Sequence, residues 1–254
     1  MIPIRDDNPH FLPPYATTAI VGLNVLAWLA VQGFGQPLAL ARSVCTLGLV
    51  PGELLGTLPA GFQVPVGPGL SCVVSGDSNW LSLLSHMFLH GGWMHLIGNM
   101  WFLWIFGNNV EDAMGHARFV VFYVLCGFAA AALQMLSDPA SGIPIVGASG
   151  AIGGVMGAYI VLYPRVNVHM LFWLGFYVTT FAIPAWWMLG YWFVVQLVSG
   201  VGASGAQGGV AFWAHVGGFV AGAGLIFVFR DRALLDRHPY HGWQAGERAY
   251  RRIR

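Results

Sequence analysis

Four polar residues stand inside long apolar stretches of this sequence: Ser149, His215, His95 and Asn99. Polar and ionisable groups inside membrane segments are costly, and they usually pair with each other or line a cavity. A serine hydroxyl becomes a good nucleophile when a neighbouring base takes its proton. A histidine, with an unperturbed pKa of about 6.5, can take that proton and later return it to a leaving amine. Ser149 and His215 are therefore candidates for peptide-bond hydrolysis.

The other two residues suit the stabilisation of negative charge. His95 and Asn99 are four residues apart, which places them on one face of a helix. Together with the backbone N–H of Ser149 they could surround an oxyanion. Each residue also has a plain structural interpretation: a serine bonded to its own backbone, a histidine at the wet interface, an asparagine between helices. Their common depth near one membrane face favours the catalytic interpretation.

The composition requires a membrane domain to position these groups. The chain has 254 residues, of which 57% are hydrophobic and 8% charged, with a mean hydropathy of +0.66. Soluble domains carry about 25% charged residues. We expect an all-α, polytopic membrane protein with six transmembrane helices, since about 20 apolar residues cross the hydrocarbon. The expected spans are residues 16–35, 92–110, 117–137, 147–164, 181–200 and 211–229.

Arginine placement predicts the orientation. All eleven basic residues are arginines, and seven of them follow Phe229. With six spans both termini share a side, and ten arginines then face the cytoplasm, leaving only Arg42 outside. Residues 166–180 are apolar enough to raise the question of a seventh span, but that span would carry the arginine-rich end across the membrane. We therefore expect a multi-pass protein of the plasma membrane with both termini cytoplasmic.

The resulting organisation has three parts. Residues 1–15 form a short cytoplasmic tail, residues 16–230 the membrane domain, and residues 231–254 an arginine-rich cytoplasmic tail. Within the membrane domain, residues 36–91 form a long outer segment with short amphipathic helices lying against the bilayer. Cys45 and Cys72 both fall in that outer segment, where a disulfide between them is possible.

Glycine spacing gives a second reason to bring Ser149 and His215 together. Pairs of glycines four residues apart form small-residue faces on the fourth and sixth spans, and such faces let helix backbones approach closely. The pairs are Gly150 with Gly154, Gly153 with Gly157, and Gly218 with Gly222. Close packing of these two spans would place the hydroxyl within hydrogen-bond reach of the imidazole. No Asp or Glu occurs in either span, so the expected arrangement is a dyad.

The combined motifs resemble the rhomboid family of intramembrane serine proteases, over residues 80–230. The matching segments are His90-Gly91-Gly92-Trp93-Met94-His95-Leu96-Ile97-Gly98-Asn99, Gly147-Ala148-Ser149-Gly150 and Ala214-His215-Val216-Gly217-Gly218-Phe219. The resemblance implies a six-helix rhomboid-like bundle that cleaves transmembrane helices of other proteins. It implies Ser149 as nucleophile, His215 as base, and His95 and Asn99 as oxyanion stabilisers, without metal or cofactor.

Other positions also take meaning from this resemblance. Glu111 matches an acidic position with a structural role, residues 201–210 correspond to a cap over the site, and the fifth span lies on the side where substrate enters. The sequence departs from the family at Trp80-Leu81, where many members have Trp-Arg. It departs again at Gly153, where some members place a ring against the catalytic histidine. Phe212 and Trp213 are candidates to supply that ring instead.

Several alternatives compete with this interpretation. His86, His90 and His95 suggest a metalloprotease, but their spacing is not His-Glu-x-x-His. A soluble esterase would need Gly-x-Ser-x-Gly, and Ala151 occupies the last position. A transporter lacks support from paired intramembrane carboxylates. The remaining alternative is a non-catalytic rhomboid-like protein that binds membrane-protein clients. The expected partners are transmembrane substrates and lipids, with no nucleic acid and no metal.

The four-letter pattern around Ser149 occurs a second time. Gly202-Ala203-Ser204-Gly205 repeats it in a glycine-rich outer loop. We expect Ser204 to belong to a flexible linker, because nothing there would orient its hydroxyl.

Overall fold

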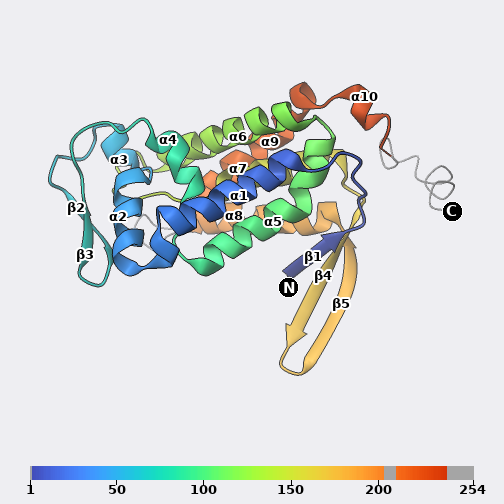
Figure 1. The fold of residues 1–254 in the computed structure, drawn as a ribbon, viewed down its shortest axis with the longest axis horizontal. Coiled ribbons are helices and arrows are strands. Elements are labelled where there is room, and N and C mark those ends of the chain that lie inside the picture. The colour runs from blue at the N-terminus through green and yellow to red at the C-terminus, as the bar shows by residue number, and fades with distance from the viewer. Residues whose placement is uncertain (1, 203–209, 239–254) are drawn as a thin grey trace.

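The computed structural model describes residues 2–202 and 210–238. Six long helices lie side by side, and each runs antiparallel to the next along the chain (Figure 1). They are α1 (Tyr15–Ala30), α5 (Trp93–Asp112), α6 (His116–Ser137), α7 (Ser149–Leu162), α8 (Ala185–Gly202) and α9 (Phe212–Phe229). Each predicted span overlaps one of these helices, with bounds that differ by a few residues. Within the described residues, α6 and α9 are long and apolar enough by themselves to cross a bilayer.

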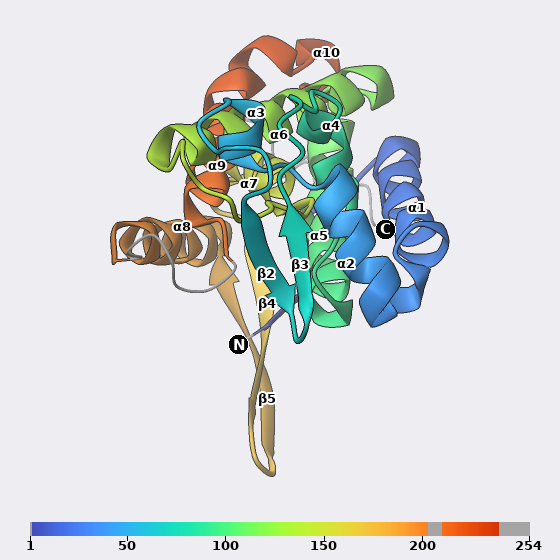
Figure 2. The ribbon, with the colours of Figure 1, turned by 90° about the vertical axis from the view of Figure 1, so that its left-hand side faces the viewer.

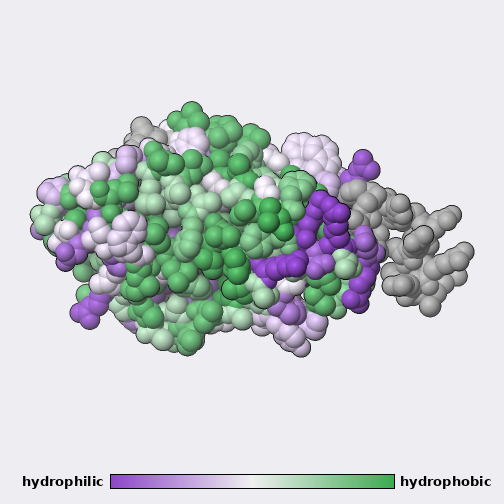
Figure 3. All heavy atoms as spheres, turned by 90° about the horizontal axis from the view of Figure 1, so that it is seen from above, coloured by the Kyte–Doolittle hydropathy of each residue, from purple (hydrophilic) through white to green (hydrophobic). Residues whose placement is uncertain are grey.

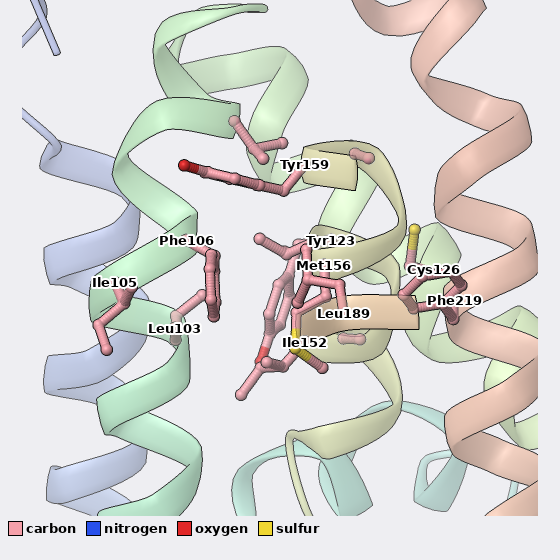
Figure 4. Close-up of a cluster of buried hydrophobic side chains, with 14 of the residues drawn as sticks. Leu103, Ile105, Phe106, Tyr123, Cys126, Ile152, Met156, Tyr159, Leu189 and Phe219 are labelled. Carbon is pink, nitrogen blue, oxygen red and sulfur yellow. The ribbon is translucent and has the colours of Figure 1, made fainter. Parts of the chain in front are cut away.

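The helix α7 forms the centre of the bundle. It packs against α5, α6 and α9, and all its residues from Gly150 to Tyr159 are buried. Figure 4 shows Ile152, Met156 and Tyr159 of α7 among side chains of the surrounding helices, including Phe106 and Phe219. At about 1.5 Å per residue its 14 residues extend about 21 Å, which is less than the roughly 30 Å of a hydrocarbon core. A residue at the start of α7 therefore lies recessed from the surface of the bundle.

The segment before α5 forms a small outer layer at one end of the bundle. It contains short helices and a two-stranded antiparallel hairpin, and Cys45 and Cys72 form a disulfide that ties α2 to β3. We call this end the disulfide end. Its elements are η1 (Gly33–Gly35), α2 (Pro37–Leu47), α3 (Pro51–Leu54), β2 (Gln63–Gly67), β3 (Leu70–Val73), α4 (Ser82–Ser85) and η2 (His86–Phe88).

The opposite end carries a three-stranded antiparallel sheet in the order β1-β4-β5. The strands are β1 (Ile2–Asp6), β4 (Asn167–Leu174) and β5 (Tyr177–Pro184), and the short helix α10 (Arg232–Leu235) lies at the same end (Figure 1). We call it the β1 end. The expectation of an all-α fold is confirmed in part: the protein is mostly helical, but it also has two small sheets. The ambiguous segment 166–180 is no seventh helix: its β-branched and aromatic residues form β4 and β5 around a turn at Gly175, where φ is 58°.

Two carboxylates fasten the N-terminal segment to the β1 end. Glu111 accepts the backbone N–H groups of Ala16 and Thr17, each at 2.8 Å, and the Thr17 hydroxyl at 2.7 Å, so it caps the start of α1. Asp112 accepts the N–H groups of Phe11 and Leu12 at 2.9 and 2.7 Å. The residues expected to form a short tail are thus bound to the bundle. Glu111, the acidic position that the resemblance implies to be structural, thus holds the start of α1 in place.

The surface distribution of polarity follows the long axis of the bundle. Figure 3 shows apolar side chains over the middle of one face and hydrophilic ones gathered toward its two ends. The exposed apolar residues on the helices include Leu26, Trp104, Val121 and Val220. A soluble protein rarely exposes so broad an apolar surface, whereas a bilayer would cover it.

Candidate functional site

Ser149 and His215 meet at the disulfide end. Ser149 is the first residue of α7 and His215 lies in the first turn of α9. The Ser149 Oγ and the His215 Nε2 are 2.8 Å apart, a hydrogen-bond distance. Both residues are half-buried, so the hydroxyl sits in a recess and remains accessible.

Glycines make this contact possible. A Cβ on Gly218 would overlap the carbonyl oxygen of Gly150, and a Cβ on Gly222 would overlap that of Gly154. The backbones of α7 and α9 therefore touch along the small-residue faces predicted from the sequence. At Gly153 a Cβ would approach the His215 carbonyl oxygen to 3.0 Å. Any side chain there would require the α9 backbone to move by a few tenths of an ångström.

The helix α8 contributes two side chains to His215. The His215 Nδ1–H donates a hydrogen bond to Gln196 Oε1, 2.7 Å away. The Nε2 atom of the neutral ring is then unprotonated and can accept the Ser149 hydroxyl. The Trp192 ring lies 5.7 Å from the His215 ring, so neither Phe212 nor Trp213 is the residue that the structure shows against it.

Sequence reasoning missed Gln196 and Trp192. Gln196 is buried, and it is the one side-chain amide in the mostly apolar α8. That isolation was the available signal, since a buried amide needs a partner. Gln196 is neither a carboxylate nor in the spans that carry the serine and the histidine, so the expectation of a dyad did not include it.

His95 faces the same recess from α5. The backbone N–H of Gly91 donates to His95 Nδ1 at 3.2 Å, so the proton of a neutral ring resides on Nε2. A Cβ on Gly147 would lie 2.8 Å from His95 Nε2 and 3.4 Å from Ser149 Oγ. A side chain at Gly147, whose φ is 129°, would therefore collide with the His95 ring, and its absence lets the backbone lie close to both an N–H donor and the hydroxyl.

Asn99 is buried one helical turn after His95. Its Nδ2 group has no hydrogen-bond partner among the described residues. Buried amide groups in native proteins are nearly always bonded, and an exception calls for an explanation. A donor kept for a reacting group is such an explanation.

The remaining histidines of this region have structural contacts. The His86 Nδ1–H donates to the Ser82 carbonyl at 2.8 Å, and the His90 ring packs edge-on against His95 at 5.1 Å. Burial lowers the pKa of His86 to about 4, and burial with the nearby His95 lowers that of His90 to about 3. In the part of the chain that the structure describes, no group of three or more His, Cys, Asp or Glu side chains is arranged to hold a metal ion. Ser204 and most of the expected cap, residues 203–209, lie outside the described residues.

Comparison with known proteins identifies the family of the chain. Residues 77–232 match the Rhomboid domain. The chain is 32% identical to RHOMBOID-like protein 4 of Arabidopsis thaliana over 190 residues, which cover 75% of the chain and 42% of that protein. It is 30% identical to RHOMBOID-like protein 1 of the same plant over 246 residues, or 93% of the chain and 58% of that protein.

A bacterial relative carries a protease name. Rhomboid protease GluP of Bacillus subtilis (strain 168) is 34% identical over 155 residues, which cover 61% of the chain and 27% of that protein. The chain spans about half the length of the first curated relatives it matches, at 42%, 48% and 54%. The matched domain contains Ser149, His215, His95 and Asn99 and covers more than half of the chain, and the protein therefore belongs to the rhomboid family.

Proposed function

We propose that this protein is an intramembrane serine endopeptidase that hydrolyses peptide bonds in or near transmembrane helices of other membrane proteins. The observation that carries the proposal is the 2.8 Å hydrogen bond between Ser149 Oγ and His215 Nε2. In a chain of this composition such a pair is expensive to maintain unless it is used. Membership of the rhomboid family, which includes relatives named proteases, supports the same reaction.

The first step is the attack of Ser149 on the substrate carbonyl carbon. His215 Nε2 takes the hydroxyl proton as the Oγ–C bond forms. The protonated ring then gives that proton to the leaving amine, and a water molecule releases the acyl group by the same sequence of transfers. Because Gln196 Oε1 accepts the hydrogen bond from His215 Nδ1–H, Nε2 stays unprotonated and can take the serine proton.

Negative charge develops on the carbonyl oxygen during the attack. The donors proposed for it are the backbone N–H of Ser149, the His95 Nε2–H and the Asn99 Nδ2–H. Two observations support this assignment: His95 Nε2 and Ser149 Oγ both lie close to the backbone at Gly147, and Asn99 Nδ2 has no partner among the described residues.

The proposed membrane arrangement has six spans, with the disulfide end outside and both termini in the cytoplasm. Disulfides form in oxidising compartments, and the Cys45–Cys72 bond lies at one end. The described arginines at the other end follow the positive-inside tendency: Arg5, Arg118, Arg165, Arg230, Arg232 and Arg237. The site then opens toward the outer face of a plasma membrane, from which water reaches the recessed start of α7.

The substrate class follows from the position of the site. A peptide bond inside a lipid-embedded helix is shielded by the helix's own hydrogen bonds. Cleavage should favour helices that unwind locally, near Gly, Ser or Pro. The expected partners are single-pass and multi-pass membrane proteins together with the surrounding lipids.

A pair of serine variants tests the proposal. The repeated Gly-Ala-Ser-Gly pattern offers a matched control, because Ser149→Ala and Ser204→Ala change the same four-letter motif at two sites. We expect Ser149→Ala to abolish both cleavage of a single-pass reporter and labelling by a fluorophosphonate probe, and Ser204→Ala to leave both intact. Mass spectrometry of the products identifies the cut bond. Cleavage that survives in Ser149→Ala would remove Ser149 from the mechanism, and reporter binding without cleavage by the unmodified protein would favour the client-binding alternative.

Gln196 has its own test as a positioning residue. Gln196→Leu keeps the size of the side chain but removes the acceptor for the His215 Nδ1 proton. We expect a fall in kcat with little change in KM, and recovery of kcat in Gln196→Glu, which restores an acceptor oxygen. A purely packing role predicts the opposite ranking, with leucine tolerated better than the buried glutamate.

A further inference from the structure

The hairpin of β4 and β5 exposes a cluster of large apolar side chains. We call residues 172–179 the hairpin tip. Phe176 at the turn is fully exposed, and Trp173, Leu174, Tyr177 and Val178 are each at least 60% exposed. No Asp, Glu, Lys or Arg occurs between residues 167 and 184. Single exposed apolar residues are ordinary on proteins, but a contiguous group marks a contact surface.

The tip has no apolar core of its own. β1 pairs with β4 only as far as Leu171, so residues 172–179 form a two-stranded ribbon that pairs Phe172 with Thr179 and Leu174 with Tyr177. Apolar side chains occupy both faces of the ribbon. Isolated two-stranded hairpins are marginally stable in water, so this ribbon requires an apolar partner outside the chain.

The position of the hairpin indicates which partner it meets. The hairpin leaves the β1 end sideways and slopes back along the bundle instead of continuing past its end (Figure 1). Seen along the bundle, it projects on the side between α5 and α8 (Figure 2). Its tip therefore reaches out over the zone where a bilayer would surround the helices. At its base Trp186 and Trp187 begin α8, are both exposed, and lie 6.1 Å apart.

We propose that the hairpin tip docks into the headgroup region of the lipid bilayer at the β1 end. Trp and Tyr side chains concentrate at this depth, where an apolar ring and a polar group are both accommodated. The hydrocarbon centre does not suit the tip, because both outer edges of the ribbon carry unpaired backbone groups that need water or headgroups as partners. The tip thus extends the apolar surface of the bundle sideways, beside α8. The inference depends on the protein being embedded in a membrane and is independent of its catalysis.

Depth-dependent quenching tests this contact. Cys126 is buried and Cys45 is bonded to Cys72, so a cysteine introduced by F176C is the accessible thiol among the described residues. The full chain carrying F176C is labelled with an environment-sensitive fluorophore and reconstituted into phosphatidylcholine–phosphatidylglycerol vesicles. We expect blue-shifted emission, and stronger quenching by a lipid with a nitroxide near the headgroup than by one with a nitroxide at the chain end.

Two further variants complete the test. A233C places the same label on exposed α10 at the same end of the bundle, and we expect little quenching there. Adding W173E to F176C should release the tip and abolish the blue shift, with far-UV circular dichroism confirming the helices. The proposal is overturned if F176C resembles A233C, if the chain-end nitroxide quenches it best, or if quenching needs an added single-pass substrate. Probe labelling of Ser149 is measured on the same samples, so a failure here stays separate from a failure of the proposed catalysis.

Discussion

Glu111 and Asn99 are both buried on α5, near opposite ends of the bundle, but their hydrogen-bonding groups are used in opposite ways. At the β1 end Glu111 receives three hydrogen bonds from Ala16 and Thr17, and His116 Nδ1 lies 2.5 Å from it. At the disulfide end Asn99 Nδ2 has no partner among the described residues, and His95 Nε2 lies beside Gly147, close to the Ser149 hydroxyl. Saturated groups hold elements together, whereas groups with unused hydrogen-bonding capacity are available to a reactant.

The largest expected effect comes from removing the base. His215→Ala should lower reporter cleavage by about 10⁴-fold, because one residue acts as both general base and general acid. His10→Ala, at the β1 end, makes the same chemical change away from the site and should leave the rate unaltered. Rates are measured in detergent and in vesicles. A loss of similar size in both variants would contradict the prediction that only the histidine at the disulfide end takes part in catalysis.

The second-largest expected loss of activity comes from one of two asparagines on α5. Asn99→Ala removes a donor without a protein partner, so kcat should fall about 10²–10³-fold with the thermal midpoint unchanged. Asn109→Ala removes a donor that binds the Asn8 carbonyl at 3.0 Å, so it should cost about 1 kcal/mol of unfolding free energy and leave kcat alone. Kinetics and thermal unfolding on both proteins would reveal any exchange of these roles.

Glu111→Gln should affect stability rather than rate. The neutral amide weakens the charge-assisted bonds from α1, and we expect a loss of about 3 kcal/mol in the free energy of unfolding. Glu53→Gln is the control: its partner Ser75 lies at the solvent-exposed surface, and the expected loss is about 0.5 kcal/mol or less. Activity per folded molecule should be equal in both. A fall in that activity for Glu111→Gln would assign the β1 end a part in catalysis.

The smallest effect is a pH dependence at β1. Burial raises the pKa of Asp6 from 3.8 to about 6, although the Tyr159 hydroxyl donates to it at 2.5 Å. Between these values the folded chain holds a proton that the unfolded chain has lost, so the free energy of unfolding falls as pH rises through this window. Asp6→Asn carries no titratable group and should flatten the profile. Thermal midpoints across about pH 4–7 give the comparison, and equal slopes in the two proteins would contradict the assignment.

The sequence predicted the positions of all six long helices and the pairing of Ser149 with His215. Both predictions relied on local signals: long apolar runs, and glycines at a spacing of four. Strands β4 and β5 were missed because residues 167–184 are mostly apolar, and an apolar run does not distinguish a helix from a strand by periodicity. The attachment of residues 2–12 was missed because Asp112 lies about 100 residues away from them.

Gln196 shows which part of the site could not be predicted from the sequence. Its contact with His215 depends on how α8 crosses α9, which no spacing along the chain encodes. The Cys45–Cys72 bond was left open for the same reason, since pairing needs two backbones at the right separation, and the structure places the Cα atoms 5.1 Å apart. Residue types identify the candidate residues, but the packing of the helices determines which of them are in contact.

The glycine contact between α7 and α9 has one more consequence. The main-chain atoms of the two helices touch at Gly218 and Gly222. The distance between the nucleophile and the base is therefore fixed by direct backbone contact, with no side chains in between. Bulky interlocking side chains can change rotamer as temperature or lipid composition varies, but this contact has none to rearrange. This backbone contact therefore sets the distance between Ser149 and His215, and even one added methyl group at either glycine would increase that distance.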